Sequence, residues 1–279
     1  MGTRTAIVTG ANSGIGLETA RGIARAGYRT VLWCRDPQKA AAAKVDIDGT
    51  ARNGHTEIVL ADLASQTGIR RAVDDLDRRV DTLDLLVNNA AAIVRKRTET
   101  DEGVDAALAI NHLGPFLLTN LLLPKLRAAP SARIVNVASD AHKLGKIDFD
   151  DLQATGGYGP FGFPRYGQTK LMNVLFTREL ARRLADTEIT ANSVHPGAVR
   201  TNLGHPPAVI RALVGLFFQS PEDGARTSLA AALDAEFAEV TGSYFVKGRP
   251  ADHKLAKAAR DDEAAARLWT MSEELTGLS

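Results

Sequence analysis

The chain has 279 residues, of which 44% are hydrophobic and 24% are charged. This length supports a large hydrophobic core, and the formal net charge of +1 gives no electrostatic reason to expect a nucleic acid or an anionic membrane as partner. The single cysteine, Cys34, excludes an internal disulfide and fits a reducing compartment. We see no secretion signal and no apolar run that approaches about 18 residues, so we expect a cytoplasmic protein without a membrane span.

The first apolar run, residues 5–9, is typical of a buried strand and leads directly into Gly10, Gly14 and Gly16. A helical pattern follows over residues 17–26. A strand, a glycine turn and a helix N-terminus in this order form an anion site, because backbone N–H groups and the positive end of the helix dipole face the same point. The spacing is GxxxGxG and differs from the older GxGxxG dinucleotide fingerprint, so an ordinary glycine turn is the alternative interpretation.

The second predicted strand, residues 29–34, is followed at once by Arg35 and Asp36. In a doubly wound nucleotide-binding fold this position meets the adenosine ribose, where an acid favours a free 2′-hydroxyl and an arginine accommodates a 2′-phosphate. Arg35 comes first, which favours NADP(H), although NAD(H) is also compatible. Asp36 can instead face the ribose or cap the helix that begins at Pro37, and Arg35 can be a solvated loop charge.

The next two strands, residues 56–60 and 83–87, also end in polar residues. Asp62 follows the first of them and can either meet an adenine edge or serve as the N-cap of the helix that runs through residue 80. Asn88 and Asn89 follow the second, where their amides can fix neighbouring backbone and line a ligand crevice.

A long helical stretch, residues 104–127, contains Asn111 and, just after it, Gly114 and Pro115. These residue types are poor choices for a helix interior, so we expect either a break with a functional reason or a plain kink. The fifth strand, residues 133–137, ends just before Ser139, whose hydroxyl can bind a substrate oxygen or only shape the turn.

Tyr166 and Lys170 lie four residues apart in a predicted helix over residues 165–184, and therefore on one helical face. A lysine beside a tyrosine favours the phenolate and lowers the phenol pKa, and such a phenol can exchange a proton with a carbonyl or an alcohol. The pair alone often arises by chance. Tyr158 is a rival phenol, but it has no lysine four residues further on.

The remaining elements are a sixth strand over residues 189–194, an apolar segment 201–219, a helix from residue 221, a strand at 244–246 and a helix over 261–275. The apolar segment can be a substrate lid, a core helix or an oligomer contact. His195 follows the sixth strand, and we read it as structural because no Cys/His/Asp cluster supports a metal site. No linker divides the chain, so residues 1–279 are expected to form a single domain.

The ordered motifs resemble the classical short-chain dehydrogenase/reductase family, and most closely its retinol dehydrogenase-like branch. The family motifs are Thr9-Gly10-Ala-Asn-Ser-Gly14-Ile-Gly16, Asn88-Asn89-Ala90, Asn111, Ser139, Tyr166-x-x-x-Lys170 and Pro196-Gly197. The branch is indicated by Trp33-Cys-Arg-Asp36 and Ser193-Val-His-Pro-Gly197. The resemblance implies a Rossmann-type, doubly wound, mostly parallel seven-stranded sheet with helices on both faces. The chain departs from the family pattern at Ala91, which stands where the family usually has glycine. Its side chain adds a methyl group close to the expected cofactor.

The resemblance also implies a role for each motif. Tyr166 would be the general acid in reduction and the base in oxidation, and Lys170 would lower its pKa and hold the nicotinamide ribose. Ser139 would orient the substrate oxygen, while Asn111 would place a water that relays protons to Lys170. The cofactor would be lined by Gly10, Ser13, Gly14, Ile15 and Gly16 at the pyrophosphate, Arg35 at the 2′-phosphate, Asp62 and Leu63 at the adenine, Asn89 and Ala90 near the adenosine ribose, and Pro196, Val199 and Thr201 at the nicotinamide.

These expectations describe an NADP(H)-dependent oxidoreductase that interconverts a carbonyl and an alcohol on an apolar or bulky small molecule. Residues 140–165 and 201–219 would form the walls of its substrate site. The alternative is a regulatory or scaffold protein that binds NADP(H) without chemistry. By analogy with the family, the helices over 104–127 and 165–184 would pair in a homodimer or homotetramer.

Overall fold

A single mixed sheet organises the chain in the computed structural model, which describes residues 3–51, 55–197 and 220–278. Its strand order is β3-β2-β1-β4-β5-β6-β7-β8, and all neighbours are parallel except the β7–β8 pair. The strands are β1 (Thr5–Thr9), β2 (Arg29–Cys34), β3 (His55–Leu60), β4 (Leu85–Asn88), β5 (Ala132–Val137), β6 (Ile189–His195), β7 (Tyr244–Val246) and β8 (Arg249–Pro250). The order reverses between β1 and β4, and ligands bind in the crevice at such a switch point.

The predicted doubly wound fold is confirmed, but the sheet has eight strands where we expected seven. The additional strand, β8, is two residues long and lies antiparallel on the edge beside β7. Two residues carry no periodic signal, and Pro250 argues against a strand interior because proline lacks a backbone donor. An edge position tolerates it.

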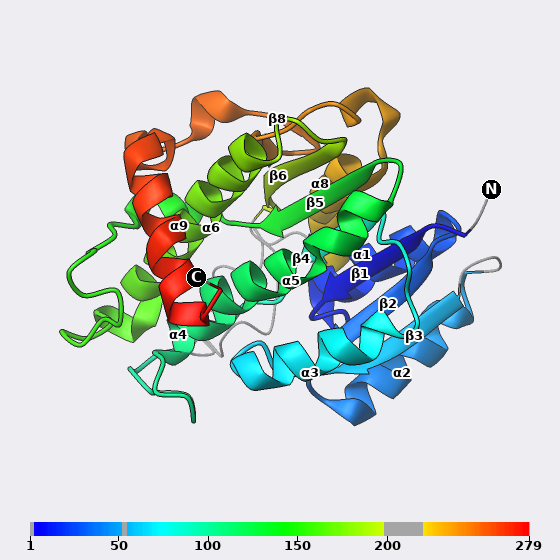
Figure 1. The fold of residues 1–279 in the computed structure, drawn as a ribbon, viewed down its shortest axis with the longest axis horizontal. Coiled ribbons are helices and arrows are strands. Elements are labelled where there is room, and N and C mark those ends of the chain that lie inside the picture. Colours follow the sequence, from blue (N-terminus) through cyan, green and yellow to red (C-terminus); the bar gives the residue numbers. More distant parts are fainter. Residues whose placement is uncertain (1–2, 52–54, 198–219, 279) are drawn as a thin grey trace.

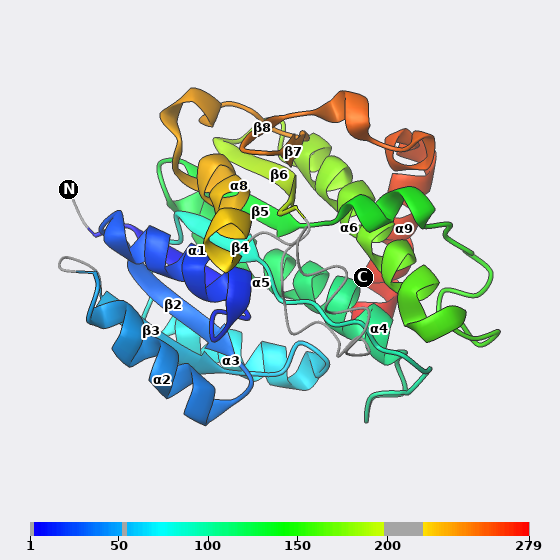
Figure 2. The ribbon, with the colours of Figure 1, turned by 180° about the vertical axis from the view of Figure 1, so that it is seen from behind.

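Helices cover both faces of the sheet (Figures 1 and 2). They are α1 (Gly14–Arg25), α2 (Pro37–Asp48), α3 (Gln66–Asp77), α4 (Ala106–Leu108), α5 (Gly114–Ala128), α6 (Phe163–Arg183), α8 (Pro221–Leu233) and α9 (Asp262–Thr276). One hydrophobic cluster joins α3, α5 and α6 to the sheet, and a second joins α1, α2 and α8 to the opposite face. The wholly buried strand β1 shows the reason: Ile7 enters the first cluster while Ala6 and Val8 enter the second, since strand side chains alternate.

The segment Ala106–Ala128 is long and apolar enough, by length and composition, to cross a membrane, with a mean hydropathy of 1.5. From the sequence we expected no membrane span, because polar residues such as Asn111 and His112 interrupt the apolar run of this segment. In the structure 72% of its most apolar window is buried. Packing against α3 and α6 therefore accounts for its apolar composition.

The C-terminal helix α9 packs along α6, over the two helices that we expected to pair between subunits (Figure 1). The Trp269 ring lies 4.9 Å from that of Phe116 on α5 and 5.9 Å from that of Phe176 on α6. A helix of the same chain thus covers these aromatic residues. The oligomeric state stays a prediction, and any pairing through α5 and α6 has to accommodate α9.

Candidate active site

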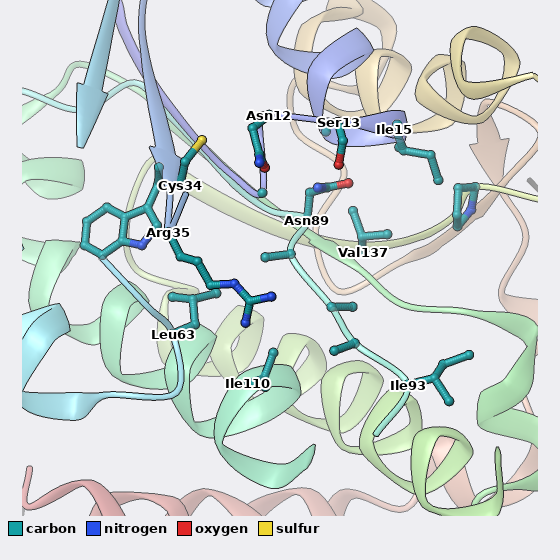
Figure 3. Close-up of a pocket in the computed structure, with 18 of the residues that line it drawn as sticks. Asn12, Ser13, Ile15, Cys34, Arg35, Leu63, Asn89, Ile93, Ile110 and Val137 are labelled. Carbon is teal, nitrogen blue, oxygen red and sulfur yellow. The ribbon is translucent and has the colours of Figure 1, made fainter. Parts of the chain in front are cut away.

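A cavity of about 830 Å³ opens at the carboxyl ends of the central strands (Figure 3). It gathers nearly all of the predicted site residues into one space. Its lining includes Gly10, Ser13, Gly14, Ile15, Gly16, Arg35, Asp62, Leu63, Asn89, Ala90, Ser139, Tyr166, Lys170 and Pro196. Asn111 is fully buried, and Val199 and Thr201 lie outside the described residues.

The glycine loop closes tightly around the first residues of α1. Gly10 and Gly14 have φ values of 66° and 55°, in the left-handed region that favours glycine. A Cβ on Gly16 would lie 2.3 Å from the Gly10 carbonyl oxygen and 2.4 Å from Asn89 Nδ2. The Ser13 side chain makes no capping hydrogen bond, so it leaves the first N–H groups of α1 to a ligand. This set of donors fits the pyrophosphate of a dinucleotide.

Thr9 joins the glycine loop to the end of β4. Its hydroxyl accepts hydrogen bonds from the backbone N–H groups of Asn89 and Ala90, at 2.9 and 3.0 Å, and Asn89 Nδ2 donates to the Thr9 carbonyl at 2.9 Å. Asn89 therefore fixes the backbone as predicted. Asn88 does not line the crevice: it is buried and donates to Thr119 and Asn136. The sequence analysis included Thr9 in the glycine-loop motif but gave it no role of its own, because a threonine that ends a strand is common.

The two charged residues after β2 separate into different roles. Asp36 accepts hydrogen bonds from the backbone N–H groups of Gln38 and Lys39, each at 3.0 Å, and so caps α2. Arg35 follows the end of β2 and lines the cavity, where its side chain points toward Leu63 and Ile110 and is 71% exposed (Figure 3). The helix-capping alternative for Asp36 is thereby confirmed, and both side chains line the cavity.

Asp62 lines the cavity but does not cap the following helix. Its carboxylate accepts a hydrogen bond from the Ala64 N–H at 2.9 Å and lies 3.8 Å from the Arg35 guanidinium. The N-cap of α3 is Ser65, whose hydroxyl accepts from the Gly68 N–H at 3.0 Å. The N-cap thus lies three residues after Asp62, and the alternative that Asp62 caps this helix is wrong. Lys39, which the sequence analysis missed, also lines this end of the cavity.

Tyr166 and Lys170 both lie on α6 and face the cavity, but their electrostatics differ from the sequence argument. Burial raises the pKa of Tyr166 to about 12, while a side-chain hydrogen bond with Ser139 acts in the lowering direction. Burial also lowers the pKa of Lys170 to about 7. The expected lowering of the phenol pKa by Lys170 is wrong for this state, because loss of solvent is the larger effect.

The Lys170 ammonium is hydrogen-bonded to the backbone at the end of β5. Its Nζ donates to the Val137 carbonyl at 2.6 Å and lies 5.6 Å from the centre of the Tyr166 ring. The side chain is fully enclosed. A phenol, a hydroxyl and a buried ammonium thus meet at one wall of the cavity, which is an arrangement suited to proton transfer.

Asn111 sits in a single π-helical turn, η1 (Ala109–Leu113), between α4 and α5. Its Oδ1 accepts from the Ala92 N–H at 2.8 Å, and its Nδ2 donates to the Ala92 carbonyl at 2.8 Å and to Thr169 Oγ1 at 3.2 Å. The irregularity expected in the long helix is a π-turn through which the helix continues, and it directs one amide to the β4 loop and to α6. Such π-turns occur frequently at functional sites.

The rival phenol, Tyr158, belongs to a buried polar cluster. Its hydroxyl donates to Asp105, and burial raises its pKa to about 12. Asp105 also pairs with Arg165 at 2.8 Å, and the two side chains are only 0% and 1% exposed. This cluster anchors the 140–165 segment beside Tyr166. The sequence analysis found no signal for it, because its members are far apart along the chain.

The surroundings of His195 agree with a structural role. Its Nδ1 accepts from the Asp140 backbone N–H at 3.3 Å, and burial lowers its pKa. Within residues 3–51, 55–197 and 220–278, no group of three or more His, Cys, Asp or Glu residues is arranged to hold a metal ion.

Comparison with known proteins agrees with this geometry. Residues 4–150 match the family described as short chain dehydrogenase. Retinol dehydrogenase 13 from Homo sapiens is 41% identical over 285 residues, covering 99% of this chain and 85% of that protein.

Solved structures are similar along most of the chain. An uncharacterized protein from Mycobacterium paratuberculosis superposes with a TM-score of 0.78 at 35% identity, over 98% of this chain and 93% of that one. An NADP complex of Pseudomonas aeruginosa RhlG gives a TM-score of 0.68 at 27% identity, over 87% and 93%. With its switch-point cavity and glycine loop, the chain belongs to the short-chain dehydrogenase/reductase family, in the retinol dehydrogenase-like branch.

Proposed function

We propose that this oxidoreductase uses NADP(H) to interconvert a carbonyl and an alcohol on an apolar or bulky substrate. The observation that carries the proposal is the meeting of Tyr166, Ser139 and Lys170 at the wall of the cavity that the glycine loop also lines. Membership of the family supports the reaction class. The residues and the cofactor preference are our proposal.

Arg35 and Lys39 support the preference for NADP(H). Both are cations in the lining of the cavity at its β2 end, where the adenosine ribose binds in such folds. One oxygen of the Asp36 carboxylate caps α2, and the other lies 3.5 Å from Lys39 Nζ, so both oxygens already have partners. The guanidinium of Arg35 lies 3.8 Å from the Asp62 carboxylate, which is long for an ion pair. A 2′-phosphate would replace Asp62 as the partner of Arg35.

The bound cofactor supplies or accepts the hydride. Tyr166 supplies the proton: with its pKa raised to about 12, the phenol is protonated at neutral pH and can donate to a carbonyl oxygen. Ser139 lines the same cavity as the phenol and is positioned to share that oxygen. Lys170 would stabilise the phenolate that remains, since the positive charge lies over the ring in a site shielded from water.

Asn111 has a different part in this proposal. Its amide is bonded to Ala92 and Thr169, so it holds the β4 loop against α6. The proton-relaying water that the family resemblance implies stays a prediction. So do the cytoplasmic location and the single-domain organisation.

The test is oxidation of NADPH, followed by its absorbance, over a panel of apolar aldehydes, ketones and quinones with NADH run in parallel. Retinal belongs in the panel because the human relative is a retinol dehydrogenase. We expect turnover with NADPH to exceed turnover with NADH. Tyr166→Phe should lower kcat by about 10²- to 10⁴-fold and leave NADPH affinity unchanged.

Tyr158→Phe is the matched control, since it removes a buried phenol hydroxyl outside the proposed chemistry. It should cost stability and keep turnover. A Tyr166→Phe enzyme that retains most of its activity would overturn the mechanism. Tight NADPH binding with no turnover of any carbonyl or alcohol would favour the alternative, a regulatory or scaffold protein.

A further inference from the structure

The C-terminal helix reaches the π-turn through one buried hydrogen bond. His112 follows Asn111 in η1, and its ring is fully buried 6.1 Å from the rings of both Phe116 and Phe176. Its Nε2 lies 2.8 Å from Ser272 Oγ on α9. These two residues are 160 positions apart, so this contact exists only when α9 is docked.

The direction of this hydrogen bond follows from the neighbouring one. Ser272 Oγ donates its hydrogen to the Leu268 carbonyl at 2.7 Å, so it can only accept from His112. Nε2 therefore carries the ring hydrogen, and Nδ1 is left as an acceptor. Among the described residues, Nδ1 is buried without a hydrogen-bond partner.

The ring acts as a neutral connector. Burial lowers the pKa of His112 to about 3, so the ring stays uncharged around neutral pH. It is consequently unsuited to proton transfer near neutral pH and suited to holding α9 against the π-turn.

Two consecutive side chains thus hold the π-turn. Asn111 bonds Ala92 and Thr169, and His112 bonds Ser272. A π-turn is a rare local widening of a helix, so its register depends on such external partners. A shift of His112 would move Asn111, its neighbour in the same turn, and loosen the Ala92 loop that lines the cavity.

We infer that Ser272 is a positioning residue for the reaction: through His112 it fixes the π-turn and so the placement of Asn111 and the Ala92 loop. This inference rests on the proposed function for its effect on turnover. The contact itself is independent of what the enzyme reduces.

The experiment compares Ser272→Ala with Thr276→Val in the full chain. Thr276 is one turn further along α9, is buried, and donates to the Ser272 carbonyl at 2.6 Å, as Ser272 donates to Leu268. Both variants remove one buried hydroxyl from α9. We expect Ser272→Ala to lower kcat about tenfold with an unchanged KM for NADPH, as small displacements near reacting groups do, and Thr276→Val to leave both constants unchanged.

Hydrogen exchange provides a readout that does not depend on turnover. The Ala92 N–H is bonded to Asn111 Oδ1, so it should exchange faster in Ser272→Ala and at the wild-type rate in Thr276→Val. Unchanged exchange at Ala92 in Ser272→Ala would overturn the inference whatever kcat does, and equal effects of the two variants would also overturn it. If the wild type reduces no carbonyl, the proposed function fails, and the exchange comparison still decides the role of Ser272.

Discussion

Replacing Gly16 with alanine tests whether the glycine loop is the cofactor cradle. Gly16 lies in the first turn of α1 and faces the backbone of the loop. The new methyl carbon would stand 2.3 Å from the Gly10 carbonyl oxygen and 2.4 Å from Asn89 Nδ2. Real Cβ atoms do not approach so closely, so α1, the loop or the Asn89 amide must move.

Opposing energies decide the sign of the effect on stability. Alanine is favoured over glycine inside a helix by at most about 1 kcal/mol. Overpacking costs about 1–3 kcal/mol, and displacing the Asn89 amide endangers its hydrogen bond to the Thr9 carbonyl, which contributes about 1 kcal/mol. We therefore expect Gly16→Ala to lower the free energy of unfolding by about 1–3 kcal/mol.

Gly22→Ala is the control, because it changes the same helix in the same way. Its Cβ would meet the Leu229 methyl groups at 2.7 Å, and the end of a leucine side chain can rotate away. Urea denaturation and fluorescence titration with NADPH measure both variants. Gly16→Ala should raise the Kd for NADPH at least about tenfold, while Gly22→Ala should leave it unchanged, since each tenfold corresponds to about 1.4 kcal/mol. Wild-type affinity and stability in Gly16→Ala would refute the reasoning.

Three further variants test the electrostatics. Asp105→Asn leaves the buried Arg165 charge without its carboxylate, so the free energy of unfolding in urea should fall by about 3–5 kcal/mol; a loss below about 1 kcal/mol would show that the pair is not desolvated. Lys170 has a pKa of about 7 in the fold against 10.5 normally, so the unfolded chain binds more protons between these values and wild-type stability should rise with pH there. Relative to Lys170→Met the gain should be about 1.4 kcal/mol per pH unit, and a pH-independent difference would contradict it. Arg35→Ala should raise the KM for NADPH about tenfold or more and spare NADH, because hydrogen bonds to charged groups contribute about 1.5–3 kcal/mol; equal effects on both cofactors would reject Arg35 as the 2′-phosphate ligand.

Local physical rules accounted for much of the site before any coordinates were considered. A strand that runs into Gly10, Gly14 and Gly16 identifies a turn and a helix N-terminus, because each signal depends on residues within one or two turns. Tyr166 and Lys170 share a helical face by spacing alone. Asn111 beside Gly114 and Pro115 indicated an irregularity in the long helix for the same reason, since helix propensity is a local property.

Choices between two local alternatives were less secure. Asp62 and Ser65 are both good N-caps, and only the coordinates show that α3 begins after Ser65. Asp36 was compatible with a ribose or a cap until its carboxylate was seen on the Gln38 and Lys39 amides. Residue propensities cannot decide between such alternatives, because Asp and Ser are both favoured as N-caps and both can also serve in other roles.

The sequence by itself determined the positions of the first seven strands along the chain, the glycine loop and the polar residues at the strand ends. Only the tertiary structure joined Asp105 to Arg165, and His112 to Ser272 across 160 positions. It also reversed the expected pKa change of Tyr166. The reason is the same in each case: burial and long-range contacts depend on how the whole chain packs, and the free energy of removing a charge from water cannot be read from neighbouring residues along the chain.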